Sequence, residues 1–159
     1  MHCIIASAGL GLGLVSWYIA TPMATRIHET APGERLIVMA TPDIDISLDG
    51  DSMVTVSNTQ PPRIELLRGN AYFDVRGNEP GKLQIKVGTA YITDIGTRFS
   101  VSVQANGGTV AVENGKIEIQ VGAGKYLIGA YERADFNNTN VTAQRVIAEA
   151  DIAPWRRDR

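Results

Sequence analysis

The side chains best suited to bind a ligand in this sequence carry oxygen atoms, and they alternate along one short stretch. Every second position from 43 to 51 holds a carboxylate or hydroxyl group: Asp43, Asp45, Ser47, Asp49 and Asp51. Oxygen ligands suit a calcium ion, but an EF-hand loop also needs a glycine at its sixth position and a glutamate at its twelfth. Counted from Asp43, those positions hold Leu48 and Val54. The stretch therefore matches the solvent-facing side of an amphipathic strand, and the sequence predicts no metal site.

Groups that could act as a nucleophile, a base or a soft metal ligand are few. His2 and His28 are the only histidines and Cys3 is the only cysteine, so they make no metal-ligand set and no intramolecular disulfide. General acid–base catalysis needs a positioned base with a tuned pKa, and the carboxylates show no recognisable pairing. We therefore expect no catalytic residues, no cofactor and no enzymatic activity.

The charge balance argues against one class of partner. The chain has 15 Lys and Arg residues and 17 Asp and Glu residues, which gives a net charge of −2. Nucleic-acid-binding domains normally show an excess of basic residues gathered on one face. The sequence therefore predicts no nucleic-acid partner.

The first 25 residues contain no Asp, Glu, Lys or Arg. Within them residues 3–20 form an apolar run, which as a helix would measure about 27 Å against a hydrocarbon core of about 30 Å. Trp17 and Tyr18 lie where an aromatic belt would meet the membrane interface, and Pro22 would end the helix. We expect residues 1–25 to be an uncleaved membrane anchor with its juxtamembrane segment; a cleaved signal peptide and a buried helix are the alternatives.

From Glu34 onward the apolar residues recur at every second position, which is the period of a β-strand. Turn residues separate about a dozen such runs at intervals of about eight to twelve residues, which indicates an all-β sandwich or barrel. Asn114-Gly115 lies between two runs and predicts a hairpin with a type I′ turn, and Asn106-Gly107 is a second candidate. The segment from Val141 to Ala150 fits either a final strand or a short helix.

Six short motifs, taken in order, resemble the FecR domain family. They are TAPGER at 30–35, LDGD at 48–51, RIELLRGNAYFDV at 63–75, DIGTRFSV at 94–101, VAVENGKI at 110–117 and PW at 154–155. Two residues depart from the family's pattern: Asp51 stands where serine is usual, and Asn70 where glutamate is usual. The resemblance covers residues 26–156 and leaves residues 157–159 as a tail.

The residues of these motifs indicate a structural role. Glycine at a junction between runs permits a positive φ without a steric clash, and the apolar members share one face by period two, so we expect them in the core. The resemblance implies a jelly-roll-like β-sandwich of about a dozen short strands, preceded by the transmembrane helix. The motif residues are Gly33, Glu34, Arg35, Asp49, Gly50, Arg63, Gly69, Phe73, Val75, Gly96, Thr97, Phe99, Val101, Gly115 and Trp155.

The resemblance also implies a function, that of a regulator in transmembrane signalling. FecR-like proteins sense an occupied TonB-dependent outer-membrane receptor, often in iron–siderophore uptake, and pass that state to an extracytoplasmic-function sigma factor. The expected location is the bacterial inner membrane, with a single pass and the β domain in the periplasm. The expected partners are the membrane, the receptor's signalling domain and a sigma factor. Family members usually bind the sigma factor through a helical cytoplasmic domain, which this sequence lacks, so we expect a truncated regulator.

A second class of function is an anchored β-sandwich that binds glycan or cell-wall material, because sandwich folds host many such sites. Glycan sites normally use exposed aromatic rings. Tyr126 and Tyr131 are the residues whose substitution would test this alternative.

Overall fold

The structure is a computed structural model that describes residues 24–77 and 83–157. Within these ranges it contains fourteen β-strands and two short 3₁₀ helices, so the all-β prediction is confirmed. The same ranges contain no helix that is both long and apolar enough to cross a membrane, and the helix predicted over residues 3–20 lies outside them. The elements are β1 (Thr25–Glu29), β2 (Leu36–Thr41), β3 (Ile44–Leu48), β4 (Met53–Ser57), β5 (Arg63–Arg68), β6 (Asn70–Val75), β7 (Gln84–Val87), β8 (Ala90–Asp94), β9 (Arg98–Gln104), β10 (Gly107–Asn114), β11 (Lys116–Val121), β12 (Gly124–Gly129), β13 (Glu132–Asn137), β14 (Val141–Val146), η1 (Glu149–Asp151) and η2 (Pro154–Arg156).

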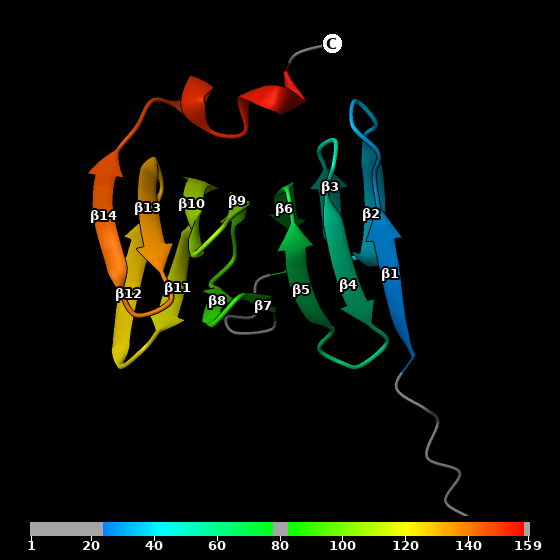
Figure 1. The fold of residues 1–159 in the computed structure, drawn as a ribbon, viewed down its shortest axis with the longest axis horizontal. Helices are drawn as coiled ribbons and strands as arrows, with labels where there is room; N and C mark the ends of the chain where they lie inside the picture. Colours follow the sequence, from blue (N-terminus) through cyan, green and yellow to red (C-terminus); the bar gives the residue numbers. More distant parts are fainter. Residues whose placement is uncertain (1–23, 78–82, 158–159) are drawn as a thin grey trace, which may run out of the picture.

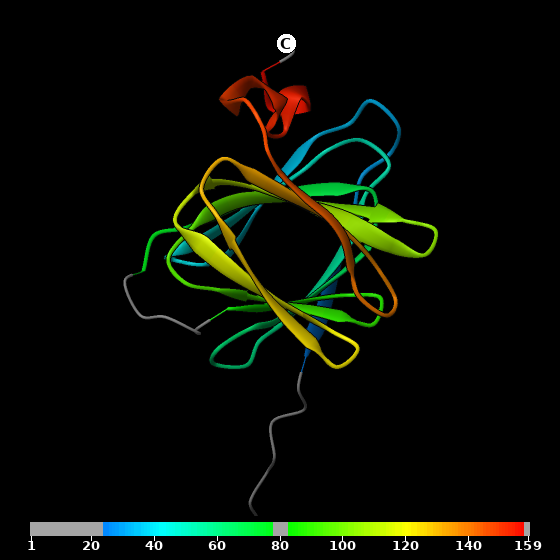
Figure 2. The same cartoon turned by 90° about the vertical axis from the view of Figure 1, so that its left-hand side faces the viewer.

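The strands form two seven-stranded sheets that lie face to face, as Figure 2 shows. Sheet A has the order β1-β4-β5-β7-β8-β11-β12, and sheet B has the order β2-β3-β6-β9-β10-β13-β14. Both orders follow the sequence, so the sandwich extends from β1 and β2 at one end to β12 and β14 at the other (Figure 1). Among the described strands, the pairing of β5 with β7 is parallel and the rest are antiparallel.

The two-layer sandwich is as predicted, and its strand order, which the sequence left open, is sequential. In a jelly roll, Greek-key connections return a strand to lie beside a much earlier one. Here the described strand pairs join residues that are close in the sequence. The largest separation is 32 positions, as between Thr25 and Ser57. Each new strand therefore adds to the edge left by the strands just before it.

The two Asn-Gly pairs have different roles in the structure. Asn106-Gly107 lies at the turn between β9 and β10, which pair as a hairpin in sheet B. The hairpin predicted at Asn114-Gly115 is wrong, because β10 belongs to sheet B and β11 to sheet A. Gly115 has a φ of +84° and carries the chain from one sheet to the other. The need for a positive φ was inferred correctly, but a sheet-to-sheet crossing meets that need as well as a type I′ turn does.

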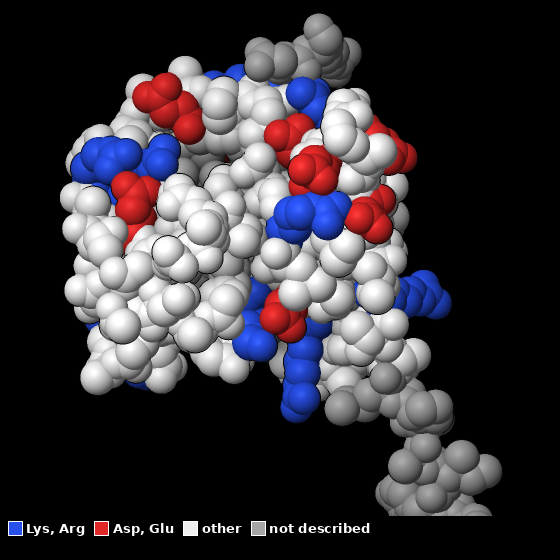
Figure 3. All heavy atoms as spheres, viewed as in Figure 1, with Lys and Arg blue, Asp and Glu red and all other residues white. Residues whose placement is uncertain are grey.

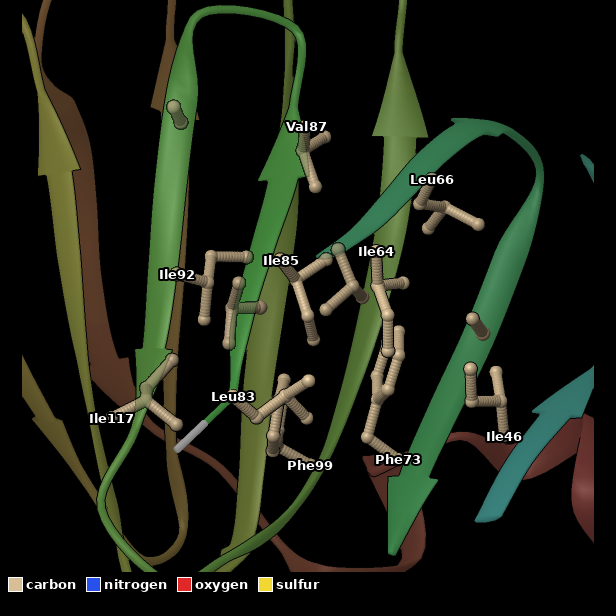
Figure 4. Packing of buried hydrophobic residues seen from close by; sticks show 14 of the residues in the cluster. Ile46, Ile64, Leu66, Phe73, Leu83, Ile85, Val87, Ile92, Phe99 and Ile117 are labelled. Atoms are coloured by element: carbon tan, nitrogen blue, oxygen red, sulfur yellow. The ribbon is translucent and has the colours of Figure 1, made fainter. Parts of the chain in front are cut away.

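The core between the sheets consists of the inward-facing residues of the alternating runs, several of which Figure 4 labels. Phe73 on β6 and Phe99 on β9 are opposite each other in register, and their rings stack with centroids 5.1 Å apart. Both rings and Val101 are fully buried, while Val75 is partly buried against the same cluster. An aromatic pair of this kind contributes about 0.5–1.5 kcal/mol beyond its burial.

Candidate functional site

Each crossing between the sheets whose residues are all described contains one residue with a positive φ. Two of these crossings consist of one residue alone, Gly69 between β5 and β6 and Gly115 between β10 and β11. Four of the six residues are glycines of the family motifs, so those motifs mark the points where the chain changes sheet. The six are Gly33 before β2, Asp51 before β4, Gly69 before β6, Gly96 before β9, Gly115 before β11 and Tyr131 before β13.

The first three crossings lie against one another and share two buried hydroxyl groups. The Thr30 hydroxyl donates to the carbonyl oxygen of Asp49 at 2.6 Å and accepts from the Ser52 N–H at 3.0 Å. The Ser52 hydroxyl accepts from the Asn70 N–H at 3.0 Å and donates to the carbonyl oxygen of Asn70 or of Gly50, each at 3.2 Å. Because a buried polar group without a partner costs about 1–3 kcal/mol, these hydroxyl groups stabilise a backbone arrangement that no sheet pairing would satisfy.

Two motif glycines in this cluster leave no room for a side chain. A Cβ added to Gly69 would lie 2.2 Å from the Ser52 Oγ and 2.6 Å from the carbonyl oxygen of Asp51. A Cβ added to Gly50 would lie 2.7 Å from the Gly33 nitrogen. Gly33 itself has nothing within 4 Å of the added Cβ, so its φ of +78° is the reason for glycine there.

The two departures from the family's pattern also lie in this cluster. Asp51 takes a φ of +53°, a conformation that Asp and Asn tolerate better than most residues because their short polar side chains bond locally. Its carboxylate pairs with the Arg68 guanidinium at 3.1 Å. Asn70 donates from its side-chain amide to the Asp49 carboxylate at 3.4 Å. Both residues therefore fit the crossing geometry of this chain.

The crossings at residues 95–97 and 115 are built around a buried carboxyl group. Asp94 is only 1% exposed, and its carboxyl accepts a hydrogen bond from the Thr97 hydroxyl. Burial raises the pKa of Asp94 to about 6, while the N–H groups of Gly96 and Ile95 oppose that rise. A Cβ added to Gly115 would lie 2.1 Å from the carbonyl oxygen of Gly96 and 2.8 Å from the Thr97 Cγ2. The motif residues at 96, 97 and 115 therefore form one packed corner.

The segment after β14, residues 147–157, crosses the outer side of sheet B, and we call it the C-terminal strap. In Figure 1 it is the red segment that runs from β14 over the molecule toward β2 and β3, and Figure 2 shows it outside the sandwich. Its residues Ile152 and Ala153 are buried. The ring of Trp155 lies 5.9 Å from the Arg35 guanidinium, next to the first crossing. The motif tryptophan thus joins the end of the domain to its beginning.

Tyr72 is the residue of sheet B that the strap covers most completely. It faces outward, because its neighbours Ala71 and Phe73 face the core, yet it is only 2% exposed. The Arg156 guanidinium lies 3.4 Å from the centroid of its ring, and its hydroxyl donates to the Glu113 carboxylate. Burial, and then the hydrogen bond to Glu113, raise the pKa of Tyr72 to about 12.

The predicted motif residues fall into three places in the structure. The apolar members form the centre of the core, and the others, apart from Arg63, gather at the two groups of crossings and beneath the strap. Glu34 accepts a hydrogen bond from the Ala31 N–H at 2.8 Å, and Arg35 lies 3.8 Å from the Asp49 carboxylate. Arg63 lies apart from these groups, with its backbone N–H bonded to the Ser57 hydroxyl at 2.7 Å.

The sequence reasoning missed four residues that hold the crossings and the strap together: Ser52, Tyr72, Asp94 and Glu113. Tyr72 had a detectable signal, because a large aromatic residue at an outward position of a strand predicts that another segment covers it. Asp94 had a weaker one, since an aspartate at the end of an apolar run, two residues before a glycine, is typical of a side-chain-capped turn.

Many charged side chains of the described residues form ion pairs. Three aspartates of the alternating acidic stretch pair with arginines, as Asp45 does with Arg76 at 2.7 Å. Within the described ranges there is no group of three or more His, Cys, Asp or Glu side chains that could hold a metal ion. Basic and acidic side chains are interspersed on the face drawn in Figure 3.

The tyrosines singled out for glycan binding do not form a platform together. Tyr126 is opposite the buried Ile119 in register and packs against the core, so its ring is turned away from the outer surface. Tyr131 lies in the crossing before β13, where it takes a φ of +60°. Tyr131 is 46% exposed, so one ring of this pair, and not both, is available for a sugar ring to stack on.

An open groove of about 570 Å³ lies between β1 and β2, where the sandwich begins. Arg26 and His28 are opposite Val56 and Val54 in register, so they share the inward face of β1 with those buried residues. Apolar side chains of β2 line the other side, and none of the described lining residues is acidic. Neither the Arg26 side chain nor the His28 side chain has a hydrogen-bond or ion-pair partner among the described residues. The groove is thus basic on one wall and apolar on the other.

Comparison with known proteins agrees with this fold and with these motifs. Two crystal structures of a "putative anti-sigma factor" from Parabacteroides distasonis resemble the chain. One, at 2.50 Å resolution, has a TM-score of 0.67 with 20% identity over 80% of this chain, and the other, at 1.65 Å, has a TM-score of 0.70 with 21% identity over 82%. The chain spans 62% and 64% of the length of those two chains. No curated protein matches the chain. The family described as FecR protein matches residues 26–118, which include every crossing motif from Gly33 to Gly115, and the chain therefore belongs to the FecR family.

Proposed function

We propose that this chain is the signalling domain of a membrane-anchored regulator of an extracytoplasmic-function sigma factor. The observation that carries the proposal is the FecR match over residues 26–118, which follows directly after the apolar run at 3–20. Two solved structures with a similar fold each carry the name "putative anti-sigma factor", which supports the same assignment. The proposed input is an occupied TonB-dependent receptor of the outer membrane, in iron–siderophore uptake.

The geometry is consistent with a part that transmits a signal by binding. Buried hydroxyl groups hold the first three crossings, and Gly69 and Gly115 leave no room for a Cβ, so these corners of the sandwich are closely packed. The strap joins the last strand to the first crossing through Trp155 and Arg35. A closely packed domain with exposed sheet edges at both ends can bind a partner at each end. It would then transmit a signal by binding, without catalysing a reaction.

The proposed location is the bacterial inner membrane, crossed once, with the β domain in the periplasm. Alkaline phosphatase and a green fluorescent protein, each fused after Arg159, test this topology in living cells. Phosphatase is active only after export, whereas the fluorescent protein matures only in the cytoplasm. We expect an active phosphatase fusion and a dark fluorescent fusion, and the reverse pattern would refute the periplasmic location.

A transcription reporter tests the sigma-factor assignment. The reporter is driven by a sigma-dependent promoter, and the chain is expressed alone or with a FecR-family helical cytoplasmic domain fused before Met1. We expect the reporter to change only with the fusion, because sigma binding is proposed for the helical domain. The same fusion with Gly115→Ala, which disrupts the packed corner, is the matched control. A strong effect from the chain alone would contradict the proposal.

A further inference from the structure

The β2 strand is an exposed sheet edge without any charge. It reads Leu-Ile-Val-Met-Ala-Thr over Leu36–Thr41 and is the terminal strand of sheet B. Ile37 and Met39 face outward and are 69% and 73% exposed. Natural proteins normally protect a free edge with charged residues, proline or a covering segment, because the unpaired N–H and C=O groups can bind another strand. Within the described residues β2 contains no charge and no proline, and no strand pairs with its outer edge. The register shift between Met39 and Thr41 interrupts the edge only near its end, so residues 36–39 are suited to pair with a partner.

The groove beside this edge adds a charge requirement. A strand paired with β2 would extend sheet B over the mouth of the groove, with every second side chain pointing toward Arg26 and His28 of β1. These two basic side chains lack partners among the described residues, and the described lining of the groove contains no acid. The inward side chains of the added strand are therefore best matched if they are acidic.

The charge requirement separates the possible occupants. A second copy of the chain, paired through its own β2, would bring another Arg26 against the first, and like charges at short range oppose association. Residues 1–23 contain no Asp or Glu, so they cannot supply a carboxylate. A segment of another protein that alternates acidic and apolar residues meets both demands, because its acidic side chains match the basic groove and its apolar side chains match the apolar outer face.

We propose that the edge of β2 binds an extended segment of another protein as an added strand of sheet B. Acidic side chains of that segment face Arg26 and His28, and apolar side chains lie beside Ile37 and Met39 on the outer face. Main-chain hydrogen bonds supply affinity in this mode of recognition, and the alternate side chains supply specificity. The proposal goes beyond the sigma-factor assignment and does not depend on it, because it rests on the edge and the groove alone.

The probe is a capped heptapeptide that alternates Val and Glu, and its matched control alternates Val and Lys. Binding to the full 159-residue chain is measured by fluorescence anisotropy, and hydrogen–deuterium exchange locates the bound peptide. The test variant carries Ile37→Lys with Met39→Lys, which places charge on the edge. The control variant carries Leu127→Lys with Val146→Lys, two residues that are 56% and 79% exposed on β12 and β14 at the opposite end. Thermal unfolding checks that each variant is folded.

The Val-Glu peptide is expected to bind the unmodified chain and the control variant and to slow exchange in residues 36–41. Its affinity should fall at least tenfold in the Ile37→Lys, Met39→Lys variant. Arg26→Glu should reverse the preference, so that the Val-Lys peptide becomes the tighter ligand. Equal binding of both peptides to the unmodified chain, or slowed exchange elsewhere, would overturn the proposal. So would a dimer, detected by sedimentation, that Ile37→Lys with Met39→Lys abolishes, because the occupant would then be a second copy.

Discussion

Replacing Asp94 with asparagine is expected to change how the stability of the domain depends on pH. Burial raises the pKa of Asp94 from 3.8 to about 6. Between these values the folded state holds a proton that the unfolded state has released, so the free energy of unfolding decreases as the pH rises. The stabilising contribution of the protonated carboxyl is fully present below pH ~4 and is lost through pH ~6.

The shift of about two pKa units corresponds to roughly 3 kcal/mol, at about 1.4 kcal/mol for each unit. The group is almost fully buried, so solvent does not screen this effect as it would a surface charge. Asparagine keeps an oxygen that can accept from the Thr97 hydroxyl, and it cannot ionise. At neutral pH the Asp94→Asn chain is therefore expected to be the more stable one, by an amount that disappears in acid.

Urea unfolding of both chains at pH 4 and at pH 7 measures the effect. The free energy of unfolding of Asp94→Asn minus that of the unmodified chain should rise by about 2 kcal/mol between the two pH values, because part of the effect of the shift has already appeared at pH 4. Asp135→Asn is the control of opposite sign. Burial alone would raise the pKa of Asp135, but hydrogen bonds from Thr109, Arg145 and Arg133 lower it. The stabilising contribution of the ionised Asp135 carboxylate is therefore lost as the pH falls. A difference for Asp94→Asn that stays constant from pH 4 to pH 7 would refute the buried-carboxyl explanation.

Three further substitutions test the crossings, the core and the strap. Gly115→Ala should lower the free energy of unfolding by about 2–5 kcal/mol, because it adds both strain at a positive φ and a clash with backbone. Gly33→Ala adds only the strain and should lower the free energy of unfolding by about 1 kcal/mol. Equal losses in urea unfolding would contradict this explanation. Phe73→Ala should cost about 3–5 kcal/mol by removing a fully buried ring from its stack, and a loss under 1 kcal/mol would show that the stack is unimportant. Arg156→Ala should release the strap, seen as faster hydrogen exchange in residues 147–157 with a loss in global stability of less than about 2 kcal/mol; unchanged exchange there would mean that the cation–π contact does not hold it.

The sequence predicted the elements of this fold well, because an amphipathic strand is a local pattern. Period two located the runs, and the buried rings of Phe73 and Phe99 lie where that period placed them. The glycine signals were also informative, since Gly69, Gly96 and Gly115 all have a positive φ. Local patterns do not say which sheet the next strand joins, and for that reason the turn at Gly115 was predicted as a hairpin when it is a crossing.

The features that the sequence did not reveal depend on contacts between distant segments. The strap places Arg156 on Tyr72 and Trp155 beside Arg35, and no spacing along the chain encodes those meetings. Arg26 and His28 had no special character as sequence. They become candidate binding residues because β1 is the terminal strand of sheet A, so that their side chains line the groove at the end of the sandwich. That position is a property of the assembled sheet.

The sequential order of both sheets has a consequence for how the chain reaches this structure. Ordering a chain into distant contacts is slow, because a long loop must close before any contact stabilises it. Here no described strand pairs with a partner more than 32 positions away. The first strands of the sandwich can therefore pair before the rest of the chain has been synthesised. The contact between Arg35 and Trp155 spans 120 positions, and it can form only after residue 155 has been synthesised. The strap is then the last segment to pack against the sandwich, and its contacts are present only in the completely folded domain.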